Sequence, residues 1–216
     1  MGEYLIIEEP YLHRFPDSWD FEEGAWAETF SIGYFGLWGY GGYVEAGDDV
    51  VILGAGPVGL TALIVARSTL ARVIVVEPLA NRRAVAERFG AEATVDPAGG
   101  QLKEIIRRLT DERGASVVVE ASGNDQAIAS IFEIAGHSTR VRLIGHSVGR
   151  KVPVEIGLTI WKTLAITGSG GTRNFGQRSI RFMDRIRGEF DVRKPVAGED
   201  VNCELARNGT LCPAPI

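Results

Sequence analysis

The hydrophobic pattern is clearest between Val50 and Leu60. It starts with four apolar residues, three of them β-branched, as expected for a buried strand (Val50-Val51-Ile52-Leu53). A glycine-rich turn follows, with glycines at positions 54, 56 and 59, and then an apolar run typical of a helix. This stretch therefore predicts a buried strand, a tight turn and a helix.

Similar units repeat along the chain. Apolar, β-rich runs begin near residues 50, 73, 94, 116, 140 and 163. Most of the gaps have helical periodicity, as in two sets that each share one face: Leu102, Ile105, Ile106 and Leu109, and Ile128, Ile131, Phe132 and Ala135. Strands that alternate with helices form a parallel sheet covered on both faces. The pattern predicts an α/β fold with a doubly wound, six-stranded parallel sheet.

The residues before position 50 predict a connection to another domain. Tyr4-Leu5-Ile6-Ile7 has the composition of a strand, yet nothing before it offers a neighbour, and a lone strand is not stable. We therefore expect the chain to begin partway through a larger protein. Asp17 or Ser18 would cap a short helix from Phe21 to Ala27.

The residues after the sixth strand are less regular. Residues 151–161 show no clear helical face, whereas Ile180, Met183 and Ile186 predict a helix that ends at Gly188. We divide the chain into a remnant strand (1–17), linking helices (18–49), a dinucleotide-binding domain (50–192) and an irregular tail (193–216).

Each glycine of the turn has a physical role in binding a dinucleotide. Gly54 makes the tight turn, Gly56 lets a pyrophosphate approach the backbone, and Gly59 lets the helix pack on the strand. Pro57 and Val58 open the helix, whose unpaired N–H groups attract phosphate. This order predicts a Rossmann-type site. A methyltransferase that binds its own adenosine cofactor is the alternative.

The choice of cofactor depends on the end of the second β-rich run. Glu77 follows that run, eighteen residues after Gly59, where an acid accepts a hydrogen bond from the ribose 2′-hydroxyl. Its carboxylate would repel the 2′-phosphate of NADP, which favours NAD. Arg82 and Arg83 weaken this argument, because they could hold that phosphate or simply form a solvated helix face.

Small residues follow the later strands, where ligands of such sheets bind. We expect them to leave room for the ribose and nicotinamide, although ordinary turn residues would look the same. His146 would contact the cofactor or, as a second possibility, act as a catalytic base. The candidates at these strand ends are Ala121, Ser122, Ile144, Gly145, His146, Ser169 and Gly170.

Composition excludes several other classes. The chain has 216 residues and a net charge of −5, which gives no electrostatic footprint for nucleic acid or an anionic membrane. It contains no apolar run of membrane-spanning length and no signal-peptide pattern, so we expect a cytoplasmic protein. Cys203 and Cys212 form no disulfide framework, and no Cys/His/Glu cluster has zinc-ligand spacing.

Several motifs together resemble the cofactor-binding half of the medium-chain, zinc-type alcohol dehydrogenase family, nearest its sorbitol, polyol and threonine dehydrogenase branch. The segments that carry this resemblance are Tyr4–Pro16 with the stretch Leu12–Asp17, Glu22–Glu28, Gly47–Gly59, Arg88–Glu92, Val119–Gly123 and Val141–Gly145. The resemblance implies hydride transfer between an alcohol carbon and NAD, with zinc polarising the substrate oxygen.

The resemblance also implies specific roles. Gly54, Gly56, Gly59, Glu77 and Arg82 match the family's NAD positions. Glu28 matches a glutamate at the zinc site, although Thr29 replaces the usual proline. The other zinc ligands belong to a GroES-like catalytic domain that would precede residue 1. The sixth strand, Leu164 to Thr167, would pair across a homodimer.

These expectations leave several functions open. The chain is part of an NAD-dependent alcohol or polyol dehydrogenase, or a module that binds NAD without turnover, or a remnant that acts only through its dimer edge. The strand pattern disfavours a methyltransferase. Zinc content separates the first two, because such an enzyme holds about one catalytic zinc per chain and this sequence offers Glu28 alone. We expect a shortened or rearranged gene product that binds the cofactor but not zinc.

Overall fold

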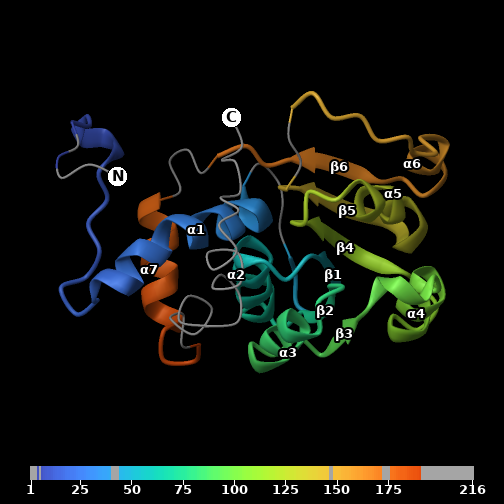
Figure 1. The fold of residues 1–216 in the computed structure, drawn as a ribbon, viewed down its shortest axis with the longest axis horizontal. Coiled ribbons are helices and arrows are strands. Elements are labelled where there is room, and N and C mark those ends of the chain that lie inside the picture. The colour runs from blue at the N-terminus through green and yellow to red at the C-terminus, as the bar shows by residue number, and fades with distance from the viewer. Residues whose placement is uncertain (1–3, 5, 40–43, 146–147, 172–175, 191–216) are drawn as a thin grey trace, which may run out of the picture.

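A computed structural model describes residues 4, 6–39, 44–145, 148–171 and 176–190. Within these residues six parallel strands form one sheet in the order β3-β2-β1-β4-β5-β6 (Figure 1). The strands are β1 (Asp49–Leu53), β2 (Arg72–Val76), β3 (Ala93–Val95), β4 (Ala115–Glu120), β5 (Ala135–Leu143) and β6 (Ala165–Gly168). The predicted doubly wound sheet is confirmed, and its order reverses between β1 and β4.

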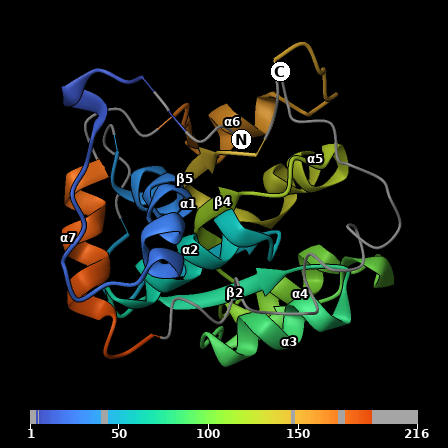
Figure 2. The ribbon, with the colours of Figure 1, turned by 60° about the vertical axis from the view of Figure 1, so that its left-hand side comes forward.

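Helices cover both faces of the sheet (Figure 2). The helices are α1 (Phe21–Trp38), α2 (Pro57–Arg67), α3 (Ala80–Arg88), α4 (Leu102–Leu109), α5 (Asp125–Ile134), α6 (Gly157–Trp161) and α7 (Gly176–Ile186). Residues of α1, α2, α3 and α7 share one hydrophobic cluster, whereas residues of α4 and α5 share the other. In β1, β2 and β4, residues that point to opposite faces of the sheet join the two different clusters, as a two-sided core requires.

The central strand shows why this sequence forms a buried parallel sheet. Val50 and Ile52 pack into the cluster below α1 and α2, while Val51 and Leu53 pack into the opposite cluster. All five residues of β1 are buried. The apolar run Val50–Leu53 is continuous because its residues contribute to the hydrophobic clusters on both faces of the sheet.

Helix α1 is longer than the sequence indicated. Neither Asp17 nor Ser18 caps it. The N-cap is Asp20, whose carboxylate accepts from the Glu23 N–H while the Glu23 side chain accepts from the Asp20 N–H. The helix continues to Trp38 because its aromatic and small residues pack against neighbouring helices.

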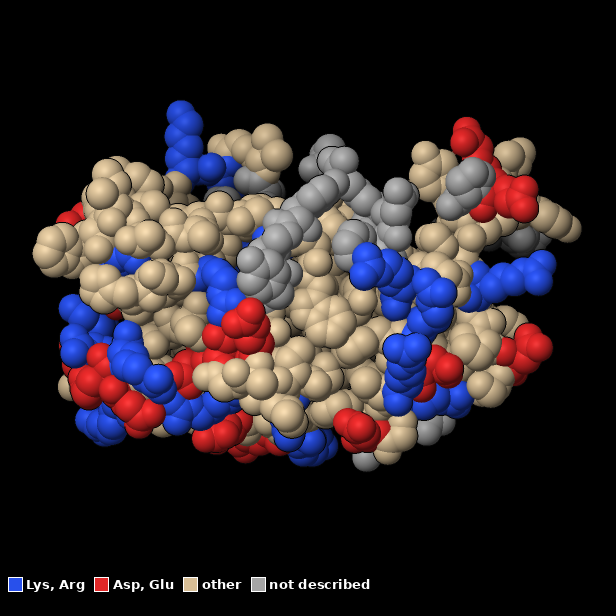
Figure 3. Space-filling view, turned by 180° about the vertical axis from the view of Figure 1, so that it is seen from behind, with Lys and Arg blue, Asp and Glu red and all other residues tan. Residues whose placement is uncertain are grey.

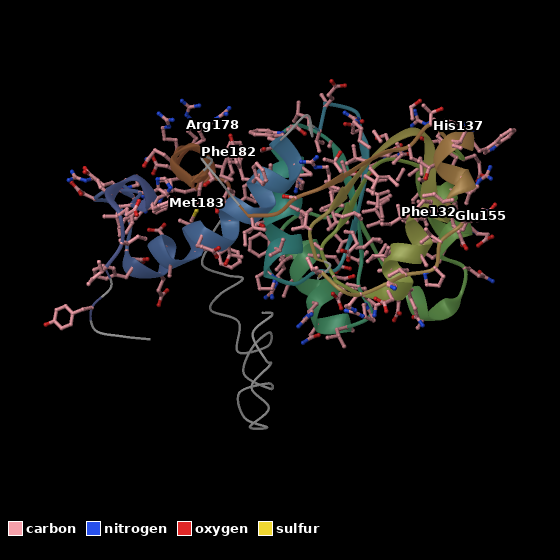
Figure 4. All side chains as sticks on the ribbon, turned by 90° about the horizontal axis from the view of Figure 1, so that it is seen from above. Phe132, His137, Glu155, Arg178, Phe182 and Met183 are labelled. Atoms are coloured by element: carbon pink, nitrogen blue, oxygen red, sulfur yellow. The ribbon has the colours of Figure 1, made fainter. Side chains whose placement is uncertain are left out.

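Two contacts explain this packing of α1. A methyl group added at Gly33 would clash with Thr61 Oγ1 and lie 2.8 Å from the Ala62 backbone nitrogen, so α1 approaches α2 closely. On its other side α1 meets α7, which carries Phe182 and Met183 (Figure 4). The ring of Phe182 packs against Tyr34 of α1, with centroids 5.2 Å apart. The predicted helix around Ile180, Met183 and Ile186 is thus confirmed, ending at Ile186 rather than Gly188.

The strand expected at residues 4–7 is wrong. Tyr4, Ile6 and Ile7 have no regular secondary structure and are exposed, and Leu5 lies outside the described residues. A short 3₁₀ turn follows at Glu9–Tyr11. The physical reason is that no described strand lies alongside this segment to pair with it.

The junction between α5 and β5 also differs from the prediction. Ala135 does not extend the helix but begins β5, so this strand starts five residues earlier than expected. Lys162 stabilises the junction, since its Nζ donates to the carbonyls of Phe132 (2.8 Å) and Ala135 (2.7 Å). Burial lowers the pKa of Lys162, helped by nearby Lys103 and Arg107. The short helix α6 lies where the sequence showed no helical face.

Ion pairs hold the amino-terminal edge of the sheet. Arg140 Nη2 of β5 donates to both carboxylate oxygens of Asp48 (2.6 and 2.7 Å), and Arg72 of β2 pairs with Asp49 at 2.6 Å. Burial partly shields these pairs from solvent. The charged groups of this edge therefore have structural partners.

One face of the molecule shows how its charged side chains are distributed. In Figure 3, acidic and basic side chains alternate at the lower left, Lys and Arg predominate in a group at the right, and uncharged residues cover most of the centre. No helix in the described ranges is long and apolar enough to cross a membrane. The predicted tail from 193 to 216 lies outside the described residues.

Gly33→Ala tests the close approach of α1 and α2. The added methyl must push the helices apart, so we expect a loss of about 1–3 kcal/mol in the free energy of unfolding, measured by urea denaturation. Gly157→Ala in α6 is the matched control, because nothing lies within 4 Å of its added methyl. Equal stability of both variants would contradict this packing.

Candidate functional site

Two glycines of the turn after β1 are required by the fold itself. Gly54 has φ of +101°, and a methyl group there would lie 3.0 Å from Ser122. A methyl group at Gly59 would overlap the carbonyl oxygen of Gly54. Both glycines therefore let β1, the turn and α2 pack closely, as the sequence predicted.

Gly56 is different, because the protein itself does not require a glycine there. Its φ of −71° suits any residue, and nothing lies within 4 Å of an added methyl group. It is the N-cap of α2, and no side chain caps the helix start at Pro57 and Val58. The turn thus leaves open space beside the positive end of a helix, which suits an anion.

Glu77 lies directly against the glycine turn. The residue is only 3% exposed. Its Oε2 accepts from the Ala55 N–H at 2.8 Å, and its Oε1 accepts from the Leu79 N–H at 3.0 Å. The carboxylate therefore connects the turn after β1 with the end of β2. It could also accept a hydrogen bond from a ligand hydroxyl.

The two arginines of α3 have different surroundings. Arg83 Nη1 donates to the carbonyls of Glu77 and Pro78, both at 2.7 Å, and pairs with Asp96 at 3.2 Å. Its guanidinium is thus already engaged in contacts within the protein. Arg82 is partly exposed, and among the described residues its side chain has no hydrogen-bond or ion-pair partner.

The ends of β4 and β5 are tied together by Glu120. Its Oε1 accepts from the N–H and the hydroxyl of Ser122 and from the Gly123 N–H, at 2.7–2.8 Å. The N–H groups of Ile144 and Gly145 donate to its carbonyl. A methyl at Gly145 would lie 2.6 Å from the Gly123 nitrogen, so this glycine has a packing reason that the sequence did not reveal.

The remaining candidates lie along the same edge of the sheet. The Ala121 N–H donates to the carbonyl of Leu53 at the end of β1. The Ser169 N–H donates to the carbonyl of Leu143, and Gly170 follows it with open space around its backbone. The fold therefore gathers these positions at the carboxyl ends of the strands. His146 lies outside the described residues.

Arg142 is a residue of this region that the sequence reasoning missed. It lies on β5 and is 3% exposed, and burial lowers its pKa. Its Nε donates to the Gly36 carbonyl (2.5 Å) and its Nη2 to the Gly39 carbonyl (2.6 Å), at the end of α1. The signal was a charged residue placed between two apolar residues, Val141 and Leu143.

The described residues do not fit a zinc ion. Glu28 is exposed on α1, and no group of three or more His, Cys, Asp or Glu side chains gathers within the described ranges. His13 packs against Gly176 at the start of α7. His137 lies at the end of the molecule remote from α7 (Figure 4). Cys203 and Cys212 are outside the described residues.

Residues 57–185 match the family model described as zinc-binding dehydrogenase. The chain belongs to this family. It is 34% identical over 159 residues to 2-dehydro-3-deoxy-L-galactonate 5-dehydrogenase from Pseudoalteromonas atlantica, a match that covers 73% of this chain and 45% of the relative. It is 30% identical over 171 residues to L-threonine 3-dehydrogenase from Anaeromyxobacter sp. strain K, covering 79% and 48%.

Solved structures agree with this assignment. A zinc-binding dehydrogenase from Sinorhizobium meliloti, solved with NADP bound, superposes with a TM-score of 0.71 at 28% identity, covering 79% of this chain and 51% of that one. Galactitol-1-phosphate dehydrogenase from Escherichia coli has the same fold, with a TM-score of 0.77 at 22% identity and coverage of 97% and 64%. The chain spans about half the length of the curated relatives it matches.

A pair of alanine substitutions separates the two kinds of glycine in the turn. Gly59→Ala forces its methyl into the Gly54 carbonyl and should cost about 1–3 kcal/mol of unfolding free energy. Gly56→Ala meets open space and should cost less than about 1 kcal/mol. Urea denaturation measures both, and a larger loss for Gly56→Ala would refute this reading of the turn.

Proposed function

We propose that this chain binds NAD(H) as the cofactor half of an alcohol or polyol dehydrogenase. The single observation that carries the proposal is the open space at Gly56, beside two glycines that the fold requires. Open space alone does not mark a ligand site, because Gly157 has it too, but at Gly56 it coincides with the start of α2 and with the ends of the central strands. The cap-free start of α2 makes an anionic pyrophosphate the natural occupant.

The order of the strands supports one orientation of the dinucleotide. Ligands of doubly wound sheets bind where the strand order reverses, which is here between β1 and β4. The adenosine half would lie toward β2, with its ribose near Glu77 and Arg82. The nicotinamide half would lie over the ends of β4, β5 and β6. The residues proposed there are Ala121, Ser122, Ile144, Gly145, His146, Ser169 and Gly170.

Glu77 favours NAD over NADP. Its buried carboxylate would repel a 2′-phosphate, and Arg83 is engaged by Asp96 and two carbonyls. Arg82 is the cation that could oppose this preference. The related structure from Sinorhizobium meliloti contains NADP, so both cofactors belong in the test.

The proposed reaction is hydride transfer between a secondary alcohol or polyol and the nicotinamide. The cofactor supplies the redox chemistry, and the residues of this chain bind and orient it. The described residues do not gather a zinc ligand set, so no step is assigned to a metal. We propose that this chain alone binds cofactor without turnover and resides in the cytoplasm.

The alternative is a non-catalytic module that dimerises. The edge strand β6 favours it, because Ala165 and Ile166 are exposed and β5 is the one neighbour of this strand within the described residues. A homodimer could form by pairing this edge across a two-fold axis. Such a dimer is compatible with cofactor binding as well.

A fluorescence titration with NADH, with NADPH in parallel, tests the proposed function. We expect saturable binding that favours NADH. Gly56→Ala should weaken NADH binding by about tenfold or more, equivalent to about 1.4 kcal/mol, because its methyl occupies the space of the phosphate. Gly157→Ala, remote from the turn, should bind NADH like the unaltered chain.

Three outcomes would contradict this proposal or a part of it. If the folded chain binds neither cofactor, the alternative function as a dimerising module remains. Analytical sedimentation would then show whether the chain forms a dimer. Equal binding by Gly56→Ala and the unaltered chain would show that the ligand does not approach the turn. Stronger binding of NADPH would overturn the role of Glu77.

A further inference from the structure

A buried guanidinium on β5 has no explanation in the proposed cofactor contacts. Arg142 lies on the face of the sheet below α1, between the apolar residues Val141 and Leu143. Burying a charge is costly unless hydrogen bonds compensate for the lost water. A side chain of this kind in the core therefore needs a physical reason.

The guanidinium binds the carboxyl-terminal end of α1. Its Nε and Nη2 donate to the carbonyls of Gly36 and Gly39, which is the C-cap residue. Carbonyls at a helix end carry partial negative charge and lack helical partners, so a cation there is favourable. The planar guanidinium holds two such carbonyls at fixed positions.

Stability alone does not account for this residue. Arg142 Nη1 is buried and has no hydrogen-bond partner among the residues that the structure describes. An unsatisfied buried donor costs free energy, and an apolar side chain of similar size often stabilises such a site better. We therefore expect the main role of the guanidinium to be fixing the position of the end of α1 relative to β5.

The same contact reaches the end of β5. Ile144, two residues after Arg142, lies against Gly36, where a methyl group would overlap Ile144 Cδ1. The N–H groups of Ile144 and Gly145 donate to the carbonyl of Glu120. The last turn of α1 and the ends of β4 and β5 thus form one connected unit.

We infer that Arg142 is a positioning residue, which holds Ile144 and Gly145 in place for the nicotinamide half of the cofactor. This inference rests on the proposed function. Arg142 is buried against the last turn of α1, so its effect on the cofactor would be indirect. Its loss should therefore affect the nicotinamide half and spare the adenosine half, which lies over β1 and β2.

Calorimetric titration with two ligands tests this inference. ADP-ribose contains the adenosine half, both phosphates and the second ribose, and NADH adds the nicotinamide ring. We expect Arg142→Met to weaken NADH binding by about tenfold while ADP-ribose affinity stays within about twofold, with tenfold equal to about 1.4 kcal/mol. Arg142→Lys, which keeps the charge, should restore part of the loss.

Arg140→Met is the matched control. Arg140 lies two residues earlier on the same strand, and its ion pair with Asp48 is at the opposite edge of the sheet. Its removal should lower thermal stability without changing the ratio of NADH to ADP-ribose affinity. If Arg142→Met does not fold, Arg142→Lys is judged by the same ratio, with an expected fall of about threefold.

The outcomes separate the two proposals. An equal loss for both ligands in the Arg142 variants, or no loss for either, would overturn the positioning role while leaving cofactor binding intact. The same fall in the ratio for Arg140→Met would also overturn it. An unaltered chain that binds neither ligand would refute the proposed function, and the inference would fall with it.

Discussion

The structure depends on the close approach of α2 to β1 through the glycine turn. Gly59 contacts the Gly54 carbonyl so closely that no side chain fits between them, and the positive φ of Gly54 redirects the chain there. This approach aims the start of α2 at the point where the strand order reverses. A helix end in that place offers N–H groups to an anion, so the packing constraint and the proposed site have the same cause.

Around this turn, the ends of the strands are joined by buried acids that bind backbone N–H groups. Glu77 connects β2 to the turn, and Glu120 connects β4 to β5. A cation, Arg142, joins β5 to the end of α1. The proposed cofactor edge is therefore held by polar contacts, whereas the middle of the sheet is held by apolar packing on both faces.

The sequence predicted the sheet well because the repeat of apolar residues and the spacing of the glycines are local signals. The six strands, the turn at Gly54 and the helix around Met183 all follow from residues close together in the chain. The prediction from sequence failed where contacts between residues far apart in the chain determine the structure. The full length of α1 depends on packing against α2 and α7, and the packing role of Gly145 depends on Gly123. The contact of Arg142 with α1 spans more than a hundred residues.

Amide NMR of the labelled chain during addition of NADH tests the central claim most directly, because it reports where a ligand binds. The account predicts that the largest shifts occur in the turn from Gly54 to Gly59 and at the ends of β4 and β5. Amides near Asp49 and Ser116, at the opposite edge, should not move. Saturable shifts confined to that opposite edge or to α4, with the turn unchanged, would contradict it.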